Sequence, residues 1–325
     1  MQQHDERARL SAAYRRFADD EARGKSPLYE RLARGVADDN EILDFLLALP
    51  RPKRQPNLLF AAARALLGTS ADWTAFRRGV TQRKDALLAL MLMRSTQTNE
   101  PGRCAALLPV LARLPQPLAL LEVGASAGLC LLPDCYGYDY GERRLLPEPR
   151  DVEPPIFPCA VSAATPIPQA LPSIAWRAGL DLEPIDIADR NQVAWLETLV
   201  WPEQTERLAR LRAAVRIAAA DKPRLVEGDL RRDLARLANE MPRNATRVIF
   251  HTAVLTYVGP TEREEFARSV TSVCDVWISN EAPQVFPDIA ARAGAPGPRP
   301  QFLLAVNGQP VAWADPHGAS LDWIA

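Results

Sequence analysis

Two glycines flank three small residues directly after a run of apolar residues in the segment 118–129. This pattern predicts a buried strand that ends in a tight turn. Glycine at Gly124 and Gly128 permits positive φ and leaves no side chain between the main chain and a ligand. A helix over about residues 126–132 would aim free N–H groups at an anionic group. Glu122, just before the turn, is suited to hydrogen-bonding an ammonium or a hydroxyl, so the segment predicts a ligand-binding loop.

Polar residues also follow later predicted strands, where a parallel sheet binds its ligands. Asp181 is placed to accept hydrogen bonds from two ribose hydroxyls, and Asp229 from an adenine amino group. Glu142 is an alternative to Asp181, because an acid with the ribose role normally lies about 20 residues after the glycine turn. His251 ends a further apolar run, where a reacting group would lie. Helix capping by the aspartates and a buried structural histidine are the alternatives.

The predicted secondary structure that must position these residues changes at residue 118. Residues 1–117 show apolar positions at three- to four-residue spacing and predict an all-helical domain. From residue 118 to 325, strand-like runs alternate with helical ones, which indicates a parallel sheet covered by helices. The predicted strands are 118–123, 174–181, 224–229, 247–252 and 275–280, followed by a hairpin from 302–306 and 311–314. A segment rich in tyrosine and proline, about 133–172, is predicted to be an insertion with its own small hairpin.

The order of these motifs resembles class I methyltransferases that use S-adenosylmethionine. The resemblance covers about residues 118–315 and rests on Glu-x-Gly-x-x-x-Gly, Gly-Leu-Asp, Gly-Asp and a hydrophobic strand with a polar tip. It implies an α/β fold, a Rossmann-like methyltransferase sheet that is parallel and ends in an antiparallel hairpin. It also implies S-adenosylmethionine as the cofactor, bound by these residues: Glu122, Gly124, Ala125, Ser126, Gly128, Asp181 and Asp229.

The whole chain resembles an uncharacterised bacterial family, domain of unknown function 2332. The matching strings are Lys-Arg-Gln-Pro-Asn-Leu-Leu-Phe at 53–60, Gln-Thr-Asn-Glu at 97–100 with Arg103, Leu-Leu-Glu-Val-Gly-Ala-Ser-Ala-Gly-Leu at 120–129, and Phe-His-Thr-Ala-Val-Leu at 250–255 up to Tyr257. The family name brings no activity with it. The chemistry therefore has to be argued from the residues.

The dense polar string that ends at Glu100, with Arg103 after it, has two interpretations. One is helix capping. The other is that the helical domain caps the active site, where Asn99 and Arg103 contact the cofactor and the arginine binds a carboxylate. For an acceptor that must lose a proton, we expect His251 as the base and Glu100 as the second candidate.

Two other functions stay open. Gly-Ala-Ser-Ala-Gly also fits the nucleophile elbow of α/β-hydrolases, with Ser126 as the nucleophile, although no His-Gly-Gly loop precedes it. A methyltransferase-like fold can also serve as a non-catalytic adenosyl-ligand-binding or protein-interaction module. A nicotinamide site fits poorly, because Ser126 stands where the motif requires its middle glycine.

Composition narrows the classes of partner. The net charge of -1 over 325 residues argues against a dedicated nucleic-acid binder or a membrane-surface protein. No secretion signal is visible, and no apolar run approaches the length that spans a bilayer. The five cysteines include no C-x-x-C and only three histidines occur, so we expect no metal site and a reducing cytoplasmic location. A small molecule is the expected methyl acceptor.

Overall fold

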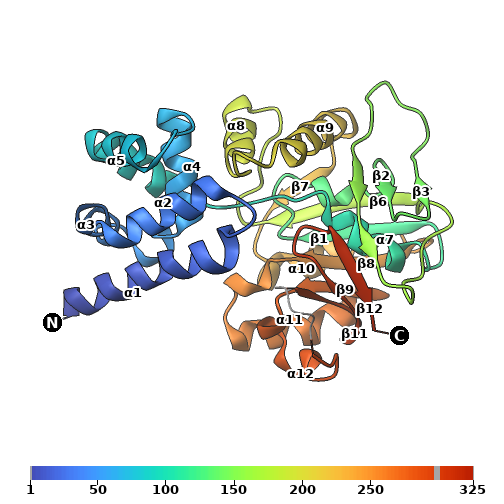
Figure 1. Cartoon of the computed structure of the whole chain (residues 1–325). Helices are drawn as coiled ribbons and strands as arrows, with labels where there is room; N and C mark the ends of the chain where they lie inside the picture. The colour runs from blue at the N-terminus through green and yellow to red at the C-terminus, as the bar shows by residue number, and fades with distance from the viewer. Residues whose placement is uncertain (1, 296–300, 325) are drawn as a thin grey trace. The chain divides into compact units, whose positions relative to one another are not determined.

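The computed structural model describes residues 2–295 and 301–324. It has a mixed α/β architecture with two compact units (Figure 1). Unit 1 comprises Met1–Thr98 and Arg190–Ala209, and unit 2 comprises Asn99–Asp189 and Arg210–Ala325. The first segment of unit 1 therefore ends at Thr98, before the expected boundary at residue 117. Unit 1 also includes residues 190–209, which come from the second half of the chain.

Unit 1 is helical, as the sequence predicts. Its elements are α1 (Gln2–Arg16), the π-helix η1 (Phe17–Ala22), α2 (Pro27–Asp38), α3 (Asn40–Leu47), the 3-10 helix η2 (Arg51–Lys53), α4 (Pro56–Leu67), α5 (Trp73–Gln82), α6 (Lys84–Met93), α8 (Arg190–Thr198) and the first turns of α9 (Thr205–Asp221). The segment around Trp201 separates α8 from α9.

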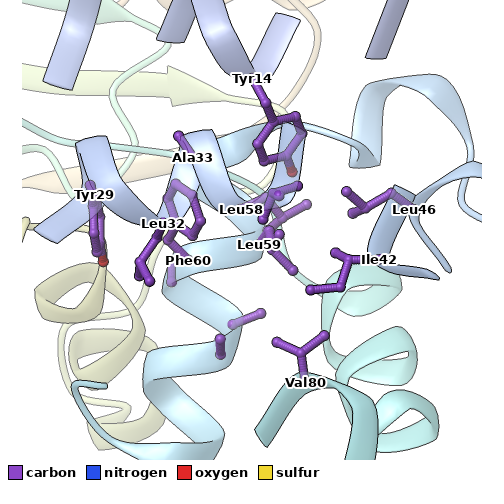
Figure 2. Close-up of a cluster of buried hydrophobic side chains, with 14 of the residues drawn as sticks. Tyr14, Tyr29, Leu32, Ala33, Ile42, Leu46, Leu58, Leu59, Phe60 and Val80 are labelled. Atoms are coloured by element: carbon purple, nitrogen blue, oxygen red, sulfur yellow. The ribbon is translucent and has the colours of Figure 1, made fainter. Parts of the chain in front are cut away.

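The core of unit 1 gathers side chains from α1 to α5 around Phe60 (Figure 2). The centre of the Phe60 ring lies 4.8 Å from the centre of the Tyr29 ring and 5.7 Å from the centre of the Phe76 ring. The segment 190–209 joins this core through Trp201, whose indole N–H donates to Asn57 Oδ1 at 3.0 Å. Asn57, at the start of α4, therefore holds two distant parts of the chain together.

All of the strands in the described part of the chain belong to unit 2. Its nine-stranded sheet contains β1 (Leu118–Val123), β5 (Ala160–Val161), β6 (Ile174–Asp181), β7 (Arg224–Glu227), β8 (Thr246–Thr252), β9 (Val276–Glu281), β10 (Phe302–Val306), β11 (Gln309–Ala314) and β12 (Ser320–Trp323). Its helices are α7 (Arg103–Leu111), the rest of α9, α10 (Leu230–Ala238), α11 (Pro260–Val273) and α12 (Pro287–Ala290), with 3-10 helices η3 (Leu129–Leu131), η4 (Leu255–Tyr257) and η5 (Pro283–Val285). All of the predicted strands are present, with small shifts at their ends.

The strand order is β5-β12-β11-β10-β9-β8-β1-β6-β7. The five strands from β7 to β9 are parallel, while β10, β11 and β12 add an antiparallel series beyond β9. The chain runs from β1 outward through β6 and β7, and then returns to the other side of β1 with β8 and β9 (Figure 1). This reversal makes the gap between the carboxyl ends of β1 and β8 a topological switch point, where ligands bind in such sheets.

Alternation along the strands divides the side chains between two faces of the sheet. One face packs on α10, α11 and α12 in an apolar core that includes Val123, Trp277 and Leu303. Glu122 lies one residue from Val123 and therefore points to the opposite face. Arg103, at the start of α7, reaches residues of that opposite face. The two faces consequently offer two separate groups of polar residues at the carboxyl edge.

The segment after β1 differs from the prediction. The expected helix over 126–132 is absent, and only the 3-10 helix η3 follows the glycine turn. The chain then forms a separate three-stranded sheet of order β3-β2-β4, made by β2 (Gly137–Asp139), β3 (Arg144–Leu145) and β4 (Ile156–Pro158). The predicted insertion is therefore larger than one hairpin. A helix dipole aimed at an anion from this loop is not part of the structure.

Within residues 2–295 and 301–324, no helix is both long and apolar enough to cross a membrane.

Candidate functional site at the carboxyl edge of the sheet

Buried polar side chains gather where β1, β8 and β9 end. Glu122, Thr252 and Asn280 are each less than 5% exposed and lie on the sheet face opposite the α10–α12 core. Thr252 pairs in register with Asn280 across β8 and β9. Since burying polar groups is unfavourable without compensating contacts, three such residues at a switch point mark a candidate site.

Glu122 is the most unusual of these residues. Its Oε2 atom has no hydrogen-bond partner among the residues that the structure describes. Burial raises the pKa of Glu122 well above its usual range, and the neighbouring Cys130 thiol adds to the rise, while the positive charge of Arg103 opposes it. The environment therefore favours the protonated carboxyl, which can donate a hydrogen bond as well as accept one.

Asn280 is fully buried, and both polar atoms of its amide lack a partner in the described part of the chain. Buried amide groups in folded proteins are satisfied in the great majority of cases. Asn280 therefore has the full capacity to bind one acceptor and one donor of a ligand or of water. Asn280 was not predicted as a site residue from the sequence, although the polar end of the buried run 276–281 was a signal that could have found it.

Arg103 lies against the same strand ends. Its Nη1 atom donates to Thr252 O at 3.0 Å and to Thr252 Oγ1 at 3.2 Å, and its Nε atom donates to Pro316 O at 2.9 Å. The guanidinium also lies 5.9 Å from the centre of the Phe302 ring. Among described residues, Nη2 makes no hydrogen bond, so two of the five N–H donors remain for an anionic group.

The glycine turn adopts the backbone conformation that its sequence predicts. The φ angles are +69° at Gly124, +52° at Ser126 and +70° at Gly128. However, a Cβ on Gly124 would lie 2.4 Å from Val254 Cγ2, and one on Gly128 would lie 2.9 Å from Leu225 Cδ2. The space that a side chain would take at Gly124 and at Gly128 is therefore filled by Val254 and Leu225 of the protein itself.

Two residues that are predicted to contact the ligand hold this turn in place. The Ser126 N–H donates to Asp181 Oδ2 at 2.7 Å, and the Glu183 N–H donates to Asp181 Oδ1 at 2.9 Å. The Leu129 N–H donates to Asn99 Oδ1 at 2.8 Å. Asp181 and Asn99 thus satisfy main-chain donors of the turn and shape it. Ala125, the second residue of the turn, is fully buried. Its Cβ packs so closely on Gly179 of β6 that a Cβ added at Gly179 would lie only 2.4 Å away.

Ser126 has none of the contacts that a hydrolase nucleophile needs. Its Oγ atom is buried and bonds no histidine or other partner within the described residues. A serine nucleophile requires a base within hydrogen-bond reach. The geometry therefore gives the hydrolase interpretation no support.

Asp229 is the N-cap of α10, which was the alternative interpretation of this residue. Its Oδ1 accepts from the Arg231 N–H at 2.9 Å, and the Arg231 guanidinium contacts both carboxylate oxygens. These hydrogen bonds from Arg231 lower the pKa of Asp229 to about 2. An adenine amino group would have to compete with this arginine.

His251 lies in the apolar core on the other face of the sheet and is fully buried. Its Nδ1 lies 2.7 Å from Glu281 Oε1, and its Nε2 accepts from the Trp277 indole N–H at 3.0 Å. Both ring nitrogens are therefore engaged, and neither can take a proton from a substrate in this arrangement. In this arrangement His251 holds the Glu281 carboxylate and the Trp277 indole in position, and its expected base role stays a prediction.

The remaining candidates are the buried Glu100 and the exposed Glu142. Glu100 Oε1 accepts from the Gly102 N–H at 3.1 Å, and Glu100 Oε2 lies 3.8 Å from Nδ1 of His317, whose side chain is 45% exposed. The Glu100 carbonyl accepts from the Cys130 thiol at 3.3 Å, so this segment lies close to Glu122. Glu142 is exposed and belongs to the connection between β2 and β3, which are strands of the small sheet and not of the nine-stranded sheet.

No group of His, Cys, Asp and Glu that could hold a metal ion is present in the residues described. The five cysteines are free thiols.

A sequence family matches nearly the whole chain. The profile of a family described as an uncharacterized protein conserved in bacteria (DUF2332) covers residues 11–323. No curated protein and no solved structure matches the chain. Because the profile spans both units, from α1 to β12, the chain belongs to the DUF2332 family.

Proposed function

We propose that unit 2 is a Rossmann-like methyltransferase domain that binds S-adenosylmethionine at the carboxyl ends of β1, β8 and β9 and methylates a small molecule in the cytoplasm. One observation carries the proposal. Buried polar atoms without partners in the described residues, on Glu122 and Asn280, lie beside the switch point and on the same face as Arg103. Such atoms are expected to be satisfied by a bound molecule or by water.

The residues present fit the chemical groups of the cofactor. The Nη2 donors of Arg103, which bond none of the described residues, suit a carboxylate, and the protonated Glu122 carboxyl suits a hydroxyl, to which it can donate and from which it can accept. The amide of Asn280 can pair with a donor and an acceptor together, as a ring edge or a diol requires. When bound, S-adenosylmethionine supplies an electrophilic methyl group on a sulfonium centre.

The protein contributes alignment and exclusion of water. The turn at 124–128 is fixed by Asp181 and Asn99 and cannot shift freely, which favours a preorganised site. Glu100 is the base in this proposal, because its carboxylate lies near the exposed side chain of His317 and can pass a proton outward. His251 takes no part in proton transfer here.

A non-catalytic adenosyl-binding module is the second candidate. The engagement of both His251 nitrogens favours it, since the residue best suited to act as a base near neutral pH is occupied. The two candidates share one binding site and differ only in turnover.

The test is isothermal titration with S-adenosylmethionine and S-adenosylhomocysteine. We expect micromolar binding to the natural protein and a loss of at least tenfold in Glu122→Gln and in Asn280→Ala. Glu227→Gln, an exposed acid on β7, is the matched control and keeps full affinity. Absence of binding in the natural protein, or equal affinity in all variants, contradicts the proposal.

If binding is confirmed, turnover with a panel of small amines, thiols and hydroxyl compounds separates the two candidates. Loss of turnover in Glu100→Gln with cofactor affinity kept supports the base role. Binding without turnover on any acceptor leaves the non-catalytic module.

A further inference from the structure

An exposed tyrosine stands on the turn that follows β8. Tyr257 is the last residue of η4 and is 75% exposed. The chain has six tyrosines, and the other five are buried: Tyr14, Tyr29, Tyr136, Tyr138 and Tyr140. The ring of Tyr257 therefore keeps its apolar area available for contact with another molecule.

The turn after β8 is held from two neighbouring elements. Glu281, at the end of β9, accepts hydrogen bonds at Oε1 from the N–H groups of Val254 at 2.9 Å and Leu255 at 3.1 Å. Arg263 of α11 donates to three carbonyl oxygens of the segment 255–258, at distances from 2.7 to 3.1 Å. Main-chain donors and acceptors of the turn are thus fixed by different side chains, which gives the exposed ring a rigid base.

The same turn begins with a strained residue. Ala253 has a φ of +57°, in the left-handed region that residues with a Cβ avoid. Its N–H donates to Asn280 O at 3.1 Å. Such strain persists only where the surrounding structure imposes it, and residues of this kind cluster at ligand-binding sites.

The turn also starts directly beside the glycine turn. A Cβ on Gly124 would lie 2.4 Å from Val254 Cγ2, so the Val254 side chain packs on Gly124. The Tyr257 N–H donates to Val254 O at 3.1 Å, which is the spacing of a 3-10 helix, and side chains three residues apart lie on the same side of such a helix. Tyr257 therefore stands on the side of η4 that Val254 turns toward the glycine turn.

A second exposed apolar side chain belongs to the same edge of the sheet. Leu182 directly follows β6 and is 70% exposed. Because β6 and β8 are the two neighbours of β1, Leu182 and Tyr257 come from the carboxyl ends of the strands on either side of the glycine turn. An aliphatic and an aromatic side chain at these places suit a flat apolar group of a ligand.

We propose that Tyr257 stacks on a planar aromatic ring of the methyl acceptor, so that the acceptor is an aromatic small molecule. This assignment of the ring to the acceptor rests on the function proposed above. Glu122 and Asn280, ascribed there to the cofactor, are buried, whereas Tyr257 is exposed at the same edge. Because an acceptor approaches a bound cofactor from solvent, its ring is the one expected at Tyr257. The adenine ring of the cofactor offers the same chemistry, and the experiment separates the two sources.

The test is fluorine NMR of the full chain labelled with fluorotyrosine. Tyr257→Phe removes one signal and thereby assigns it. The labelled chain is saturated with S-adenosylhomocysteine and then titrated with phenol, indole and quinoline, and with cyclohexanol as the non-aromatic control. We expect a saturable shift of the Tyr257 signal with at least one aromatic probe, with a dissociation constant of about 1 mM or weaker, and no shift with cyclohexanol.

Variants at two exposed positions make the result specific. Tyr257→Leu keeps an apolar side chain but removes the ring, so it should weaken binding of the aromatic probe about threefold or more, as measured by saturation-transfer NMR of the probe. Tyr257→Phe keeps the ring and should bind the probe as the natural chain does. Leu146, after β3, is 59% exposed and provides a matched control position. In the double variant Tyr257→Phe and Leu146→Tyr, the signal of the added fluorotyrosine should show no saturable shift.

Three results would overturn the proposal. They are the absence of a saturable shift with all of the aromatic probes, equal shifts with cyclohexanol or at position 146, and undiminished binding by Tyr257→Leu. A Tyr257 signal that S-adenosylhomocysteine alone shifts, with the aromatic probes then excluded, would overturn it in favour of the adenine ring.

Failure of the proposed function gives a different result. In that case S-adenosylhomocysteine does not bind in the calorimetric titration described above, and the probes are titrated into the free chain. A saturable shift of the Tyr257 signal there still supports a ring-binding site, and its absence removes the site as well.

Discussion

Replacing Asn280 with valine removes a buried amide whose two polar atoms have no partner among the described residues. Valine is about as large as asparagine and is favoured in strands, so the change neither opens a large cavity nor disturbs β9. An unsatisfied buried polar group costs about 1–3 kcal/mol of stability. We therefore expect Asn280→Val to raise the free energy of unfolding by about 2 kcal/mol.

The matched control is Asn99→Val. Asn99 is also a buried asparagine beside the glycine turn, but its Oδ1 accepts from the Leu129 N–H at 2.8 Å. Removing this acceptor leaves the main-chain donor without its partner, so Asn99→Val should lower stability by about 1–3 kcal/mol. The same substitution is thus predicted to change stability in opposite directions at two buried asparagines.

Differential scanning calorimetry without ligand measures both effects. For domains of about 150–250 residues, 1 kcal/mol shifts the melting temperature by about 2–4 °C. We expect Asn280→Val to melt about 4–8 °C higher than the natural chain and Asn99→Val to melt lower. The stabilised variant should also lose cofactor affinity, as is usual when a site holds unpaired polar groups for a ligand. If Asn280→Val melts lower, its amide is satisfied in the free protein, and the reasoning from unpaired atoms fails.

Three further changes test other parts of the structure. Gly124→Ala should destabilise by more than about 1 kcal/mol, because its Cβ meets Val254 and φ is positive, and adding Val254→Ala should restore part of the melting temperature. Asp229→Ala should lower the free energy of unfolding in urea by about 1 kcal/mol at neutral pH. Because the pKa of Asp229 is lower in the folded than in the unfolded chain, this loss of stability should shrink as the pH falls from about 4 to about 2. A loss that stays constant over this pH range would contradict the Arg231 contact. His251→Ala should cost about 3 kcal/mol or more in urea unfolding by leaving buried partners unpaired, and a near-neutral effect would refute its positioning role.

Much of the fold could be predicted from the sequence, because the strands of the sheet are long apolar runs. The run 118–123 and the run 174–181 have the observed bounds of β1 and β6. The prediction of a helix after Gly124 was wrong, because a glycine turn can be followed by an α-helix or by a 3-10 turn. Here the chain leaves the sheet at once to form β2, β3 and β4.

The candidate site could be predicted only in part. Glu122 was identified because an acid between an apolar run and a glycine turn is conspicuous. The partners of Asp229 and His251 could not be foreseen, since Arg231 and Trp277 become neighbours only through capping geometry and strand pairing. Asn280 was missed because a single asparagine at a strand end is common, and its lack of partners is a property of the folded chain.

A crystal structure of the full chain grown with S-adenosylhomocysteine tests the central claim most directly. We expect ligand density at the carboxyl ends of β1 and β8, with polar atoms of the ligand within hydrogen-bond distance of Glu122 and Asn280 and a carboxylate against Arg103. Density elsewhere on the chain, or ordered water alone on Glu122 and Asn280 at saturating ligand, would contradict it.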